Sequence, residues 1–248
     1  METKNEYTLR PTFGDSFGTG WRVMADNFLR LLLVVIILGI LTAPFKFLDF
    51  KFNAHDLDNM GDFFRGNDFS QMFAIGTLGV LAAFFALIAM LYALLIAPVF
   101  NYGGDMIFVQ SVRKIKPDFE YLIKGFMENY FHIVLANLLV TALIVMGFFL
   151  LIIPGIILAC RLVFVSYIIM DKKVDPIEAV EMSWRLTRGH GWRIFLMGIV
   201  SFFIILFGLL MLIVGIFPAI MWVASSFASL YESVLREKQP VIETQPAI

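Results

Sequence analysis

Charged residues are scarce in this 248-residue chain, and their scarcity is the first guide to its class. Only 16% of the residues are Asp, Glu, Lys or Arg, whereas 60% are hydrophobic and the mean hydropathy is +0.84. A soluble domain usually has about 25% charged residues. The composition therefore excludes a disordered chain and argues against an ordinary soluble enzyme. The net charge of −1 provides no bulk attraction for nucleic acid, so no nucleic-acid partner is expected.

Residue types that carry covalent or metal chemistry are equally few. The single cysteine, Cys160, lies in an apolar run, and one cysteine excludes an intrachain disulfide. There are three histidines, and no metal-ligand spacing, G-x-S-x-G, H-E-x-x-H or phosphate-binding glycine loop occurs. We therefore predict a protein that is not an enzyme and that has no catalytic residue, no cofactor and no metal site.

Long apolar tracts, by contrast, are abundant. Uncharged runs cover residues 31–45 and 72–100, and two longer tracts cover residues 131–170 and 194–231. A helix needs about 20 residues to cross the hydrocarbon core of a bilayer. Each of the two longer tracts can therefore cross a membrane twice.

Helix-breaking residues lie near the middle of both longer tracts. Pro154 and Gly155 interrupt the third tract, and Gly215 with Pro218 interrupts the fourth, so a helical hairpin is predicted in each. The predicted fold is all-α, a single polytopic membrane domain over residues 1–248, with six transmembrane helices arranged as three hairpins. The spans are expected at about 28–45, 72–98, 131–152, 154–170, 194–214 and 216–234, with an outer loop at 46–71.

The distribution of basic residues distinguishes six spans from four. With six spans and a cytoplasmic N-terminus, only Lys46, Lys51 and Arg65 lie outside and Arg161 lies within a span, while every other Lys and Arg lies inside. Four spans would put the basic segment after Met170 outside and remove this bias. The positive-inside rule thus favours six spans with both termini in the cytoplasm. No signal-peptide cleavage pattern follows the first span, so we expect that span to be retained.

Three amphipathic segments precede the odd-numbered spans and resemble one another. They cover residues 16–30, 117–132 and 175–193, and each ends with a basic residue at the start of a span. Such segments are predicted to be cytoplasmic interfacial helices, repeated three times together with the hairpins.

The third segment has the clearest helix signals. Asp175 is suited to an N-cap, Pro176 to the first helical position and Gly189 to the stop. Trp184 and Trp192 lie at the predicted inner interface, a depth that indole rings favour.

Arg161 stands out because it is the only charge well inside a predicted span. A central arginine costs about 2.5–3.5 kcal/mol on insertion scales, so its guanidinium must face protein, water or a bound anion. It either ties helices together or forms an anion or phosphate-headgroup site. For Arg185, Arg188 and Arg193, simple anchoring of the next span and docking of anionic lipid or a partner both stay open. Polar side chains that could contact Arg161 are Asn137, Thr141, Ser166, Tyr167, Ser225, Ser226 and Glu232.

Residues 151–195 carry a resemblance to a known family. The matching features are Pro154-Gly155, Arg161, Asp171, Pro176 with Ala179, Ser183-Trp184, Thr187, Gly189 and Trp192-Arg193. The segment resembles a widespread bacterial family of uncharacterised multi-pass proteins and is similar to the membrane domain of some glycerophosphoryl diester phosphodiesterases. These 248 residues have no stretch long or polar enough for the catalytic barrel of those enzymes, so no catalytic residue is carried over. The resemblance implies a helical module of the bacterial inner membrane without a settled activity.

The sequence predicts a non-enzymatic integral membrane module. Its partners would be membrane lipids, or another membrane or cytoplasmic protein, bound through the interfacial helices and the Arg161 region. The alternative is a small-solute or lipid transporter with a site near Arg161, which the internal repeats favour. The scarcity of polar residues in the spans counts against a transport path.

Overall fold

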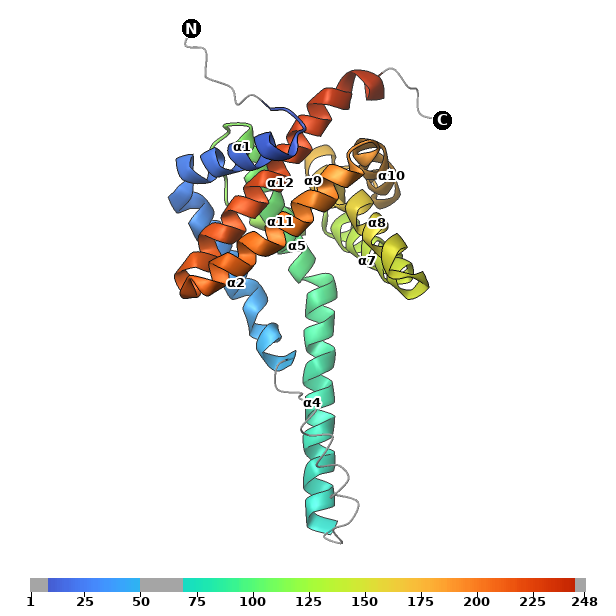
Figure 1. The fold of residues 1–248 in the computed structure, drawn as a ribbon. Coiled ribbons are helices and arrows are strands. Elements are labelled where there is room, and N and C mark those ends of the chain that lie inside the picture. Colours follow the sequence, from blue (N-terminus) through green and yellow to red (C-terminus); the bar gives the residue numbers. More distant parts are fainter. Residues whose placement is uncertain (1–8, 50–68, 244–248) are drawn as a thin grey trace.

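The computed structural model describes residues 9–49 and 69–243, which are almost entirely helical (Figure 1). Within these two ranges there is no strand, so the all-α class is confirmed. Most of the predicted outer loop, residues 46–71, lies outside the described residues. The helices are α1 (Phe13–Asp26), α2 (Phe28–Asp49), α4 (Phe69–Leu95), α5 (Ala97–Val112), α6 (Tyr121–Glu128), α7 (Tyr130–Leu150), α8 (Ile152–Leu162), α9 (Val165–Lys172), α10 (Pro176–Thr187), α11 (Gly191–Leu210) and α12 (Leu212–Glu243).

Several helical segments are long and apolar enough to cross a membrane. Four qualify by themselves: Ala83–Val112, Tyr130–Leu150, Ile152–Lys172 and Gly191–Leu210. A fifth is obtained when α1 and the first part of α2, bent by 95° relative to each other, are counted as one span. Large apolar side chains cover the outer surfaces of these helices, as a surface in contact with lipid requires.

The two long apolar tracts break earlier than predicted. α7 and α8 are separated at Leu151, whose backbone is extended, and Pro154 lies in the first turn of α8. A first-turn proline removes an N–H that has no partner within the helix, so Pro154 follows the break instead of making it. α11 and α12 are separated at Met211, and Pro218 lies inside α12.

Glycines predicted as breakers serve instead in helix packing. α7 packs against α8, and a Cβ on Gly147 would lie only 3.0 Å from the Cα of Gly155. α11 packs against α12, and a Cβ on Gly208 would lie 2.8 Å from the carbonyl oxygen of Gly215. Side chains at these positions would push the helices apart, which is why small residues are needed at such contacts.

A short helix precedes α2, α7 and α11, in the places where amphipathic segments were predicted. These helices are α1, α6 and α10. α10 has Asp175 at its N-cap and Pro176 as its first residue, and Gly189 follows it with φ +89°. The Asp175 carboxylate makes no capping hydrogen bond, however, because it pairs with His132 Nε2 at 3.1 Å.

The core lies where α5, α9 and α12 pack together, with α1 laid across α12. Ile107, Ile168 and Tyr231 are among its fully buried side chains. Trp222 Nε1 donates to the Phe17 carbonyl oxygen at 3.0 Å and fixes the crossing of α1 over α12. α4 extends away from this bundle, whereas α5 lies within it (Figure 1).

Gly20 lies at a tight contact between α1 and α12, and it provides a test of this packing. A Cβ there would lie 2.7 Å from the backbone nitrogen of Ser226. We expect Gly20→Ala to lower the melting temperature of the detergent-solubilised protein, because overpacking costs about 1–3 kcal/mol. Gly18→Ala is the matched control, since a Cβ there meets open space. An equal melting temperature for the two variants would contradict the crossing.

Candidate functional site

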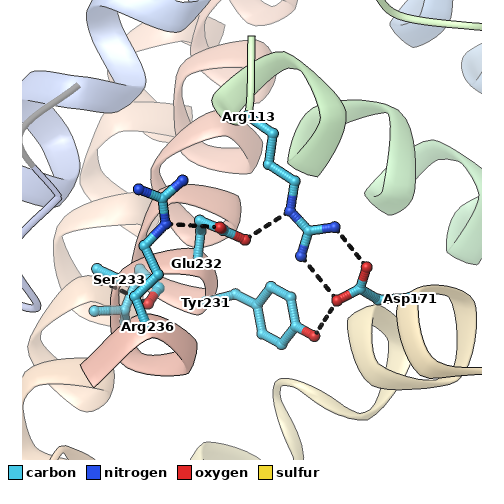
Figure 2. Close-up of polar contacts among 7 residues, drawn as sticks. Arg113, Asp171, Tyr231, Glu232, Ser233 and Arg236 are labelled. Carbon is cyan, nitrogen blue, oxygen red and sulfur yellow. Dashed lines mark hydrogen bonds and ion pairs between the residues drawn. The ribbon is translucent and has the colours of Figure 1, made fainter. Parts of the chain in front are cut away.

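An ion network with buried carboxylates joins the ends of α5 and α9 to the interior of α12 (Figure 2). Arg113, the residue after α5, donates from Nη1 and Nη2 to the two carboxylate oxygens of Asp171 at 2.5 and 2.8 Å. Its Nε donates to Glu232 Oε2 at 2.8 Å. The planar guanidinium thus binds one carboxylate through two nitrogens and a second carboxylate through the third, so all of its nitrogens are used.

Two further side chains complete this Arg113 network. The Tyr231 hydroxyl donates to Asp171 Oδ2 at 3.0 Å, and Arg236 Nε donates to Glu232 Oε1 at 2.9 Å. The side chains of Asp171 and Glu232 are only 8% and 7% exposed. Both carboxylates are therefore paired and hydrogen-bonded, as burial of a charge requires.

Burial alone would lower the pKa of Arg113. Its hydrogen bonds with Asp171 and Glu232 and their negative charges outweigh this effect and raise the pKa above its ordinary value. The network consequently stays charged, and its mutual pairing leaves no reason to assign it a ligand. We interpret it as the structural junction of the bundle.

A second group of charges lies at the end of α10 and differs from the network in having no carboxylate at its centre. The Arg161 guanidinium lies over the Trp184 ring, with Cζ 5.4 Å from the centroid. Its Nη1 is buried, and within the described part of the chain it has no hydrogen-bond partner. Lys238 Nζ donates to the carbonyl oxygens of Arg185 and Arg188 at 2.9 and 2.6 Å. We call Arg161, Arg188 and Lys238 the basic cluster.

The cations of the basic cluster act on one another. Burial lowers the pKa of Lys238, and although Glu237 opposes this effect, the positive charges of Arg161 and Arg188 lower the pKa further. Among the described residues, no carboxylate forms an ion pair with the side chain of Arg161 or Arg188. Because Arg161 and Arg188 have no carboxylate paired with them, the cluster is a favourable place for an anion.

Arg161 lies near the middle of the candidate span Ile152–Lys172, as predicted. The helix is interrupted there, because α8 ends at Leu162 and Arg161 is in its last turn. Its carbonyl oxygen is free of the helix and accepts the Ser183 hydroxyl of α10 at 2.7 Å. Its side chain forms no hydrogen bond with the partners proposed from the sequence, and Glu232 binds Arg113 and Arg236 instead.

The other three predicted arginines differ in their contacts. Arg185, on α10, and Arg188, directly after it, have exposed side chains, and their carbonyl oxygens accept hydrogen bonds from Lys238. Arg193 is engaged elsewhere, because its Nη1 donates to the Pro11 carbonyl oxygen at 2.5 Å.

Asp105 is a further charge inside a candidate span. It lies on α5 within Ala83–Val112, with Ser166 of α9 in hydrogen-bonding reach. Arg161 is therefore not the only intramembrane charge, because the second span continues past its predicted end at residue 98. No group of three or more His, Cys, Asp or Glu residues that could hold a metal ion occurs in residues 9–49 and 69–243.

Sequence reasoning missed both the Arg113 network and Lys238. Asp171 and Glu232 are 58 and 119 positions from Arg113, and Lys238 is 50 positions from Arg188. One signal was available for the two acids: Asp171 and Glu232 each directly follow an apolar tract that ends on the predicted cytoplasmic side. Which acid pairs with which arginine depends on the order of helices around the bundle, and no local pattern encodes that order.

Comparisons with protein-family models, with curated proteins and with solved structures find no match to this chain. The resemblance noted for residues 151–195 therefore stays a prediction, and function has to be inferred from the chain's own geometry.

The Arg113 network predicts an unequal response to removal of buried and exposed ion pairs. Arg113→Ala leaves the buried Asp171 carboxylate without a cation and leaves Glu232 only its partly exposed pair with Arg236. Breaking a buried ion pair in this way typically costs about 3–5 kcal/mol. We expect a large fall in the melting temperature of the detergent-solubilised protein. Lys124→Ala, which removes an exposed pair with Glu120 within one helix, should leave it unchanged. Similar melting temperatures for both variants would contradict the junction role.

Proposed function

We propose that this protein is a non-enzymatic, multi-pass module of the bacterial inner membrane that binds anionic phospholipid headgroups at its cytoplasmic face. The observation that carries the proposal is the basic cluster: a buried Arg161 nitrogen that has no hydrogen-bond partner among the described residues, near Lys238 and Arg188 and not ion-paired with a carboxylate. Phosphate oxygens are the acceptors that such a guanidinium lacks. Binding of another membrane or cytoplasmic protein at the same cluster is the other outcome of the tests below.

The proposed membrane arrangement has six spans in three hairpins, with both termini in the cytoplasm. In it, α2 with α4, α7 with α8–α9, and α11 with α12 form the hairpins. Supporting features are the packing within each of these pairs and the excess of basic residues on one predicted side. α1, α6 and α10 then lie along the inner interface, where the exposed Trp192 and the half-exposed Trp184 favour the headgroup region.

The chemistry of the basic cluster suits a phosphodiester headgroup. Trp184 supports the Arg161 guanidinium from one face, which orients its nitrogens. Lys238 is held in place by two carbonyl oxygens at the end of α10, where a cation also interacts favourably with the helix dipole. The site is thus pre-organised, with little ordering of side chains left for the binding step.

Transport of a small solute or lipid is a second candidate function. The break between α8 and α9 at Val163–Phe164 lies beside Arg161, and discontinuous helices often form midplane sites in transporters. Asp105, inside Ala83–Val112, is a second intramembrane charge of the kind that marks solute or ion pathways.

Lipid selectivity tests the proposed function. Delipidated protein in mild detergent should bind phosphatidylglycerol in preference to phosphatidylcholine, as measured by native mass spectrometry. Arg161→Gln should weaken phosphatidylglycerol binding about tenfold, equivalent to about 1.4 kcal/mol. Arg22→Gln, which removes the same charge from an exposed position on α1, should not.

Either of two results would contradict this proposal. Equal binding of both lipids by the wild type would remove the headgroup site. Flux of solute or lipid across proteoliposomes that Arg161→Gln abolishes would establish transport instead.

Labelling of single cysteines tests the proposed topology. In a Cys160→Ala background, Leu151→Cys and Met211→Cys lie at exposed helix junctions and should react in intact cells with a membrane-impermeant maleimide. Glu178→Cys, on the exposed face of α10, should react only after the membrane is permeabilised. Labelling of Glu178→Cys in intact cells would exclude the six-span arrangement.

A further inference from the structure

An apolar groove lies beside the basic cluster, between α8 and α11 with α12 behind them. Its volume is about 550 Å³, and its walls include Ala159, Cys160, Gly198, Phe202 and Phe227. Every lining side chain is apolar or, at Cys160, a thiol. The volume falls within the range of about 300–1,000 Å³ that is usual for small-molecule sites.

The groove lies next to the basic cluster. Cys160 in the groove wall directly precedes Arg161 in the chain. The groove follows α11 from Ile194 to Phe203, which corresponds to about 13 Å of helix. Its lining is apolar throughout, and the charge of Arg161 lies outside the lining, next to Cys160.

Residues 9–49 and 69–243 leave the groove open. A Cβ added to Gly198 would have no atom within 4 Å, so no neighbouring side chain fills this part of the wall. Phe202, farther along α11, is 64% exposed. An open apolar groove on an outward face requires an apolar occupant.

A second groove offers a contrast within the same molecule. It lies between α7 and α10 and has a volume of about 620 Å³. Its walls include Asp175, Glu178 and Glu181, and it has no arginine or lysine in its lining. An anionic amphiphile is repelled from this groove, whereas the charge of Arg161 next to the α8–α11 groove attracts one.

We infer that the α8–α11 groove holds an acyl chain of the anionic phospholipid whose phosphate occupies the basic cluster. This inference rests on the proposed function and specifies its ligand as an intact phospholipid rather than a free phosphate ester. Headgroup and chain contribute separately: the phosphate supplies acceptors to Arg161 and Lys238, and the chain covers the apolar wall around Gly198.

Photocrosslinking locates the chain directly in the wild-type protein. The probe is phosphatidylglycerol with a diazirine in one acyl chain, and the crosslinked peptides are identified by mass spectrometry. Crosslinks should concentrate on residues 159–163 and 194–203, and unlabelled phosphatidylglycerol should suppress them while unlabelled phosphatidylcholine should not. An even distribution over all apolar helices would overturn the inference.

A pair of glycine variants tests the groove independently. Gly198→Leu fills the open space and should weaken phosphatidylglycerol binding about tenfold, or about 1.4 kcal/mol. Gly39→Leu is the matched control: Gly39 is also an exposed helical glycine with open space around its Cβ, but it lies on α2. The affinity of the Gly39→Leu variant for phosphatidylglycerol should equal that of the wild type.

The outcomes separate the groove from the headgroup site. If Arg161→Gln weakens binding but Gly198→Leu does not, the groove is excluded and the proposed headgroup site stands. If neither variant changes binding, both proposals fail. Full displacement of phosphatidylglycerol by an equal concentration of glycerol phosphate would identify a site for a free phosphate ester and would also exclude the groove.

Discussion

The bidentate pairing of Arg113 with Asp171 is the interaction on which the rest of the bundle depends. It joins the end of α5 to α9, and through Glu232 it also joins both to α12. A buried charge is tolerated only when it is paired and hydrogen-bonded, so the ends of α5 and α9 must stay beside Glu232 of α12 in one orientation. The surrounding core, with Ile107, Ile168 and Tyr231, packs against helices that this pairing has already positioned.

The same pairing explains why the basic cluster is unpaired. Asp171 and Glu232 are the buried acids near the ends of the spans, and Arg113 and Arg236 occupy them both. Arg161 therefore rests on the Trp184 ring and has no carboxylate. Its unmet hydrogen-bonding capacity is thus a consequence of the junction, and it is this capacity that the phospholipid phosphate is proposed to meet.

The sequence predicted which segments are helical more accurately than it predicted where the helices end. Long apolar tracts predict helices whatever their neighbours are, and the helices are present. The break at Leu151 was misplaced because proline is compatible with a first helical turn, so Pro154 lies after the interruption. The break at Met211 also precedes the residues predicted to make it, and Pro218 lies inside α12. Asp175 shows the same limit: it is an N-cap by position, but contact with His132 on α7 redirects its carboxylate.

Composition and periodicity alone determined the helical class, the membrane-crossing candidates and the short helices that precede three of them, because each of these depends on the local chain and its solvent. The network partners of Arg113, the stacking of Arg161 on Trp184 and the addition of Lys238 were decided by tertiary structure. These contacts join residues that are tens to more than a hundred positions apart. The geometry of these contacts depends on which helices are neighbours and on how each helix is rotated. Packing of the apolar surfaces of all the helices together fixes both properties, so no local stretch of sequence encodes them.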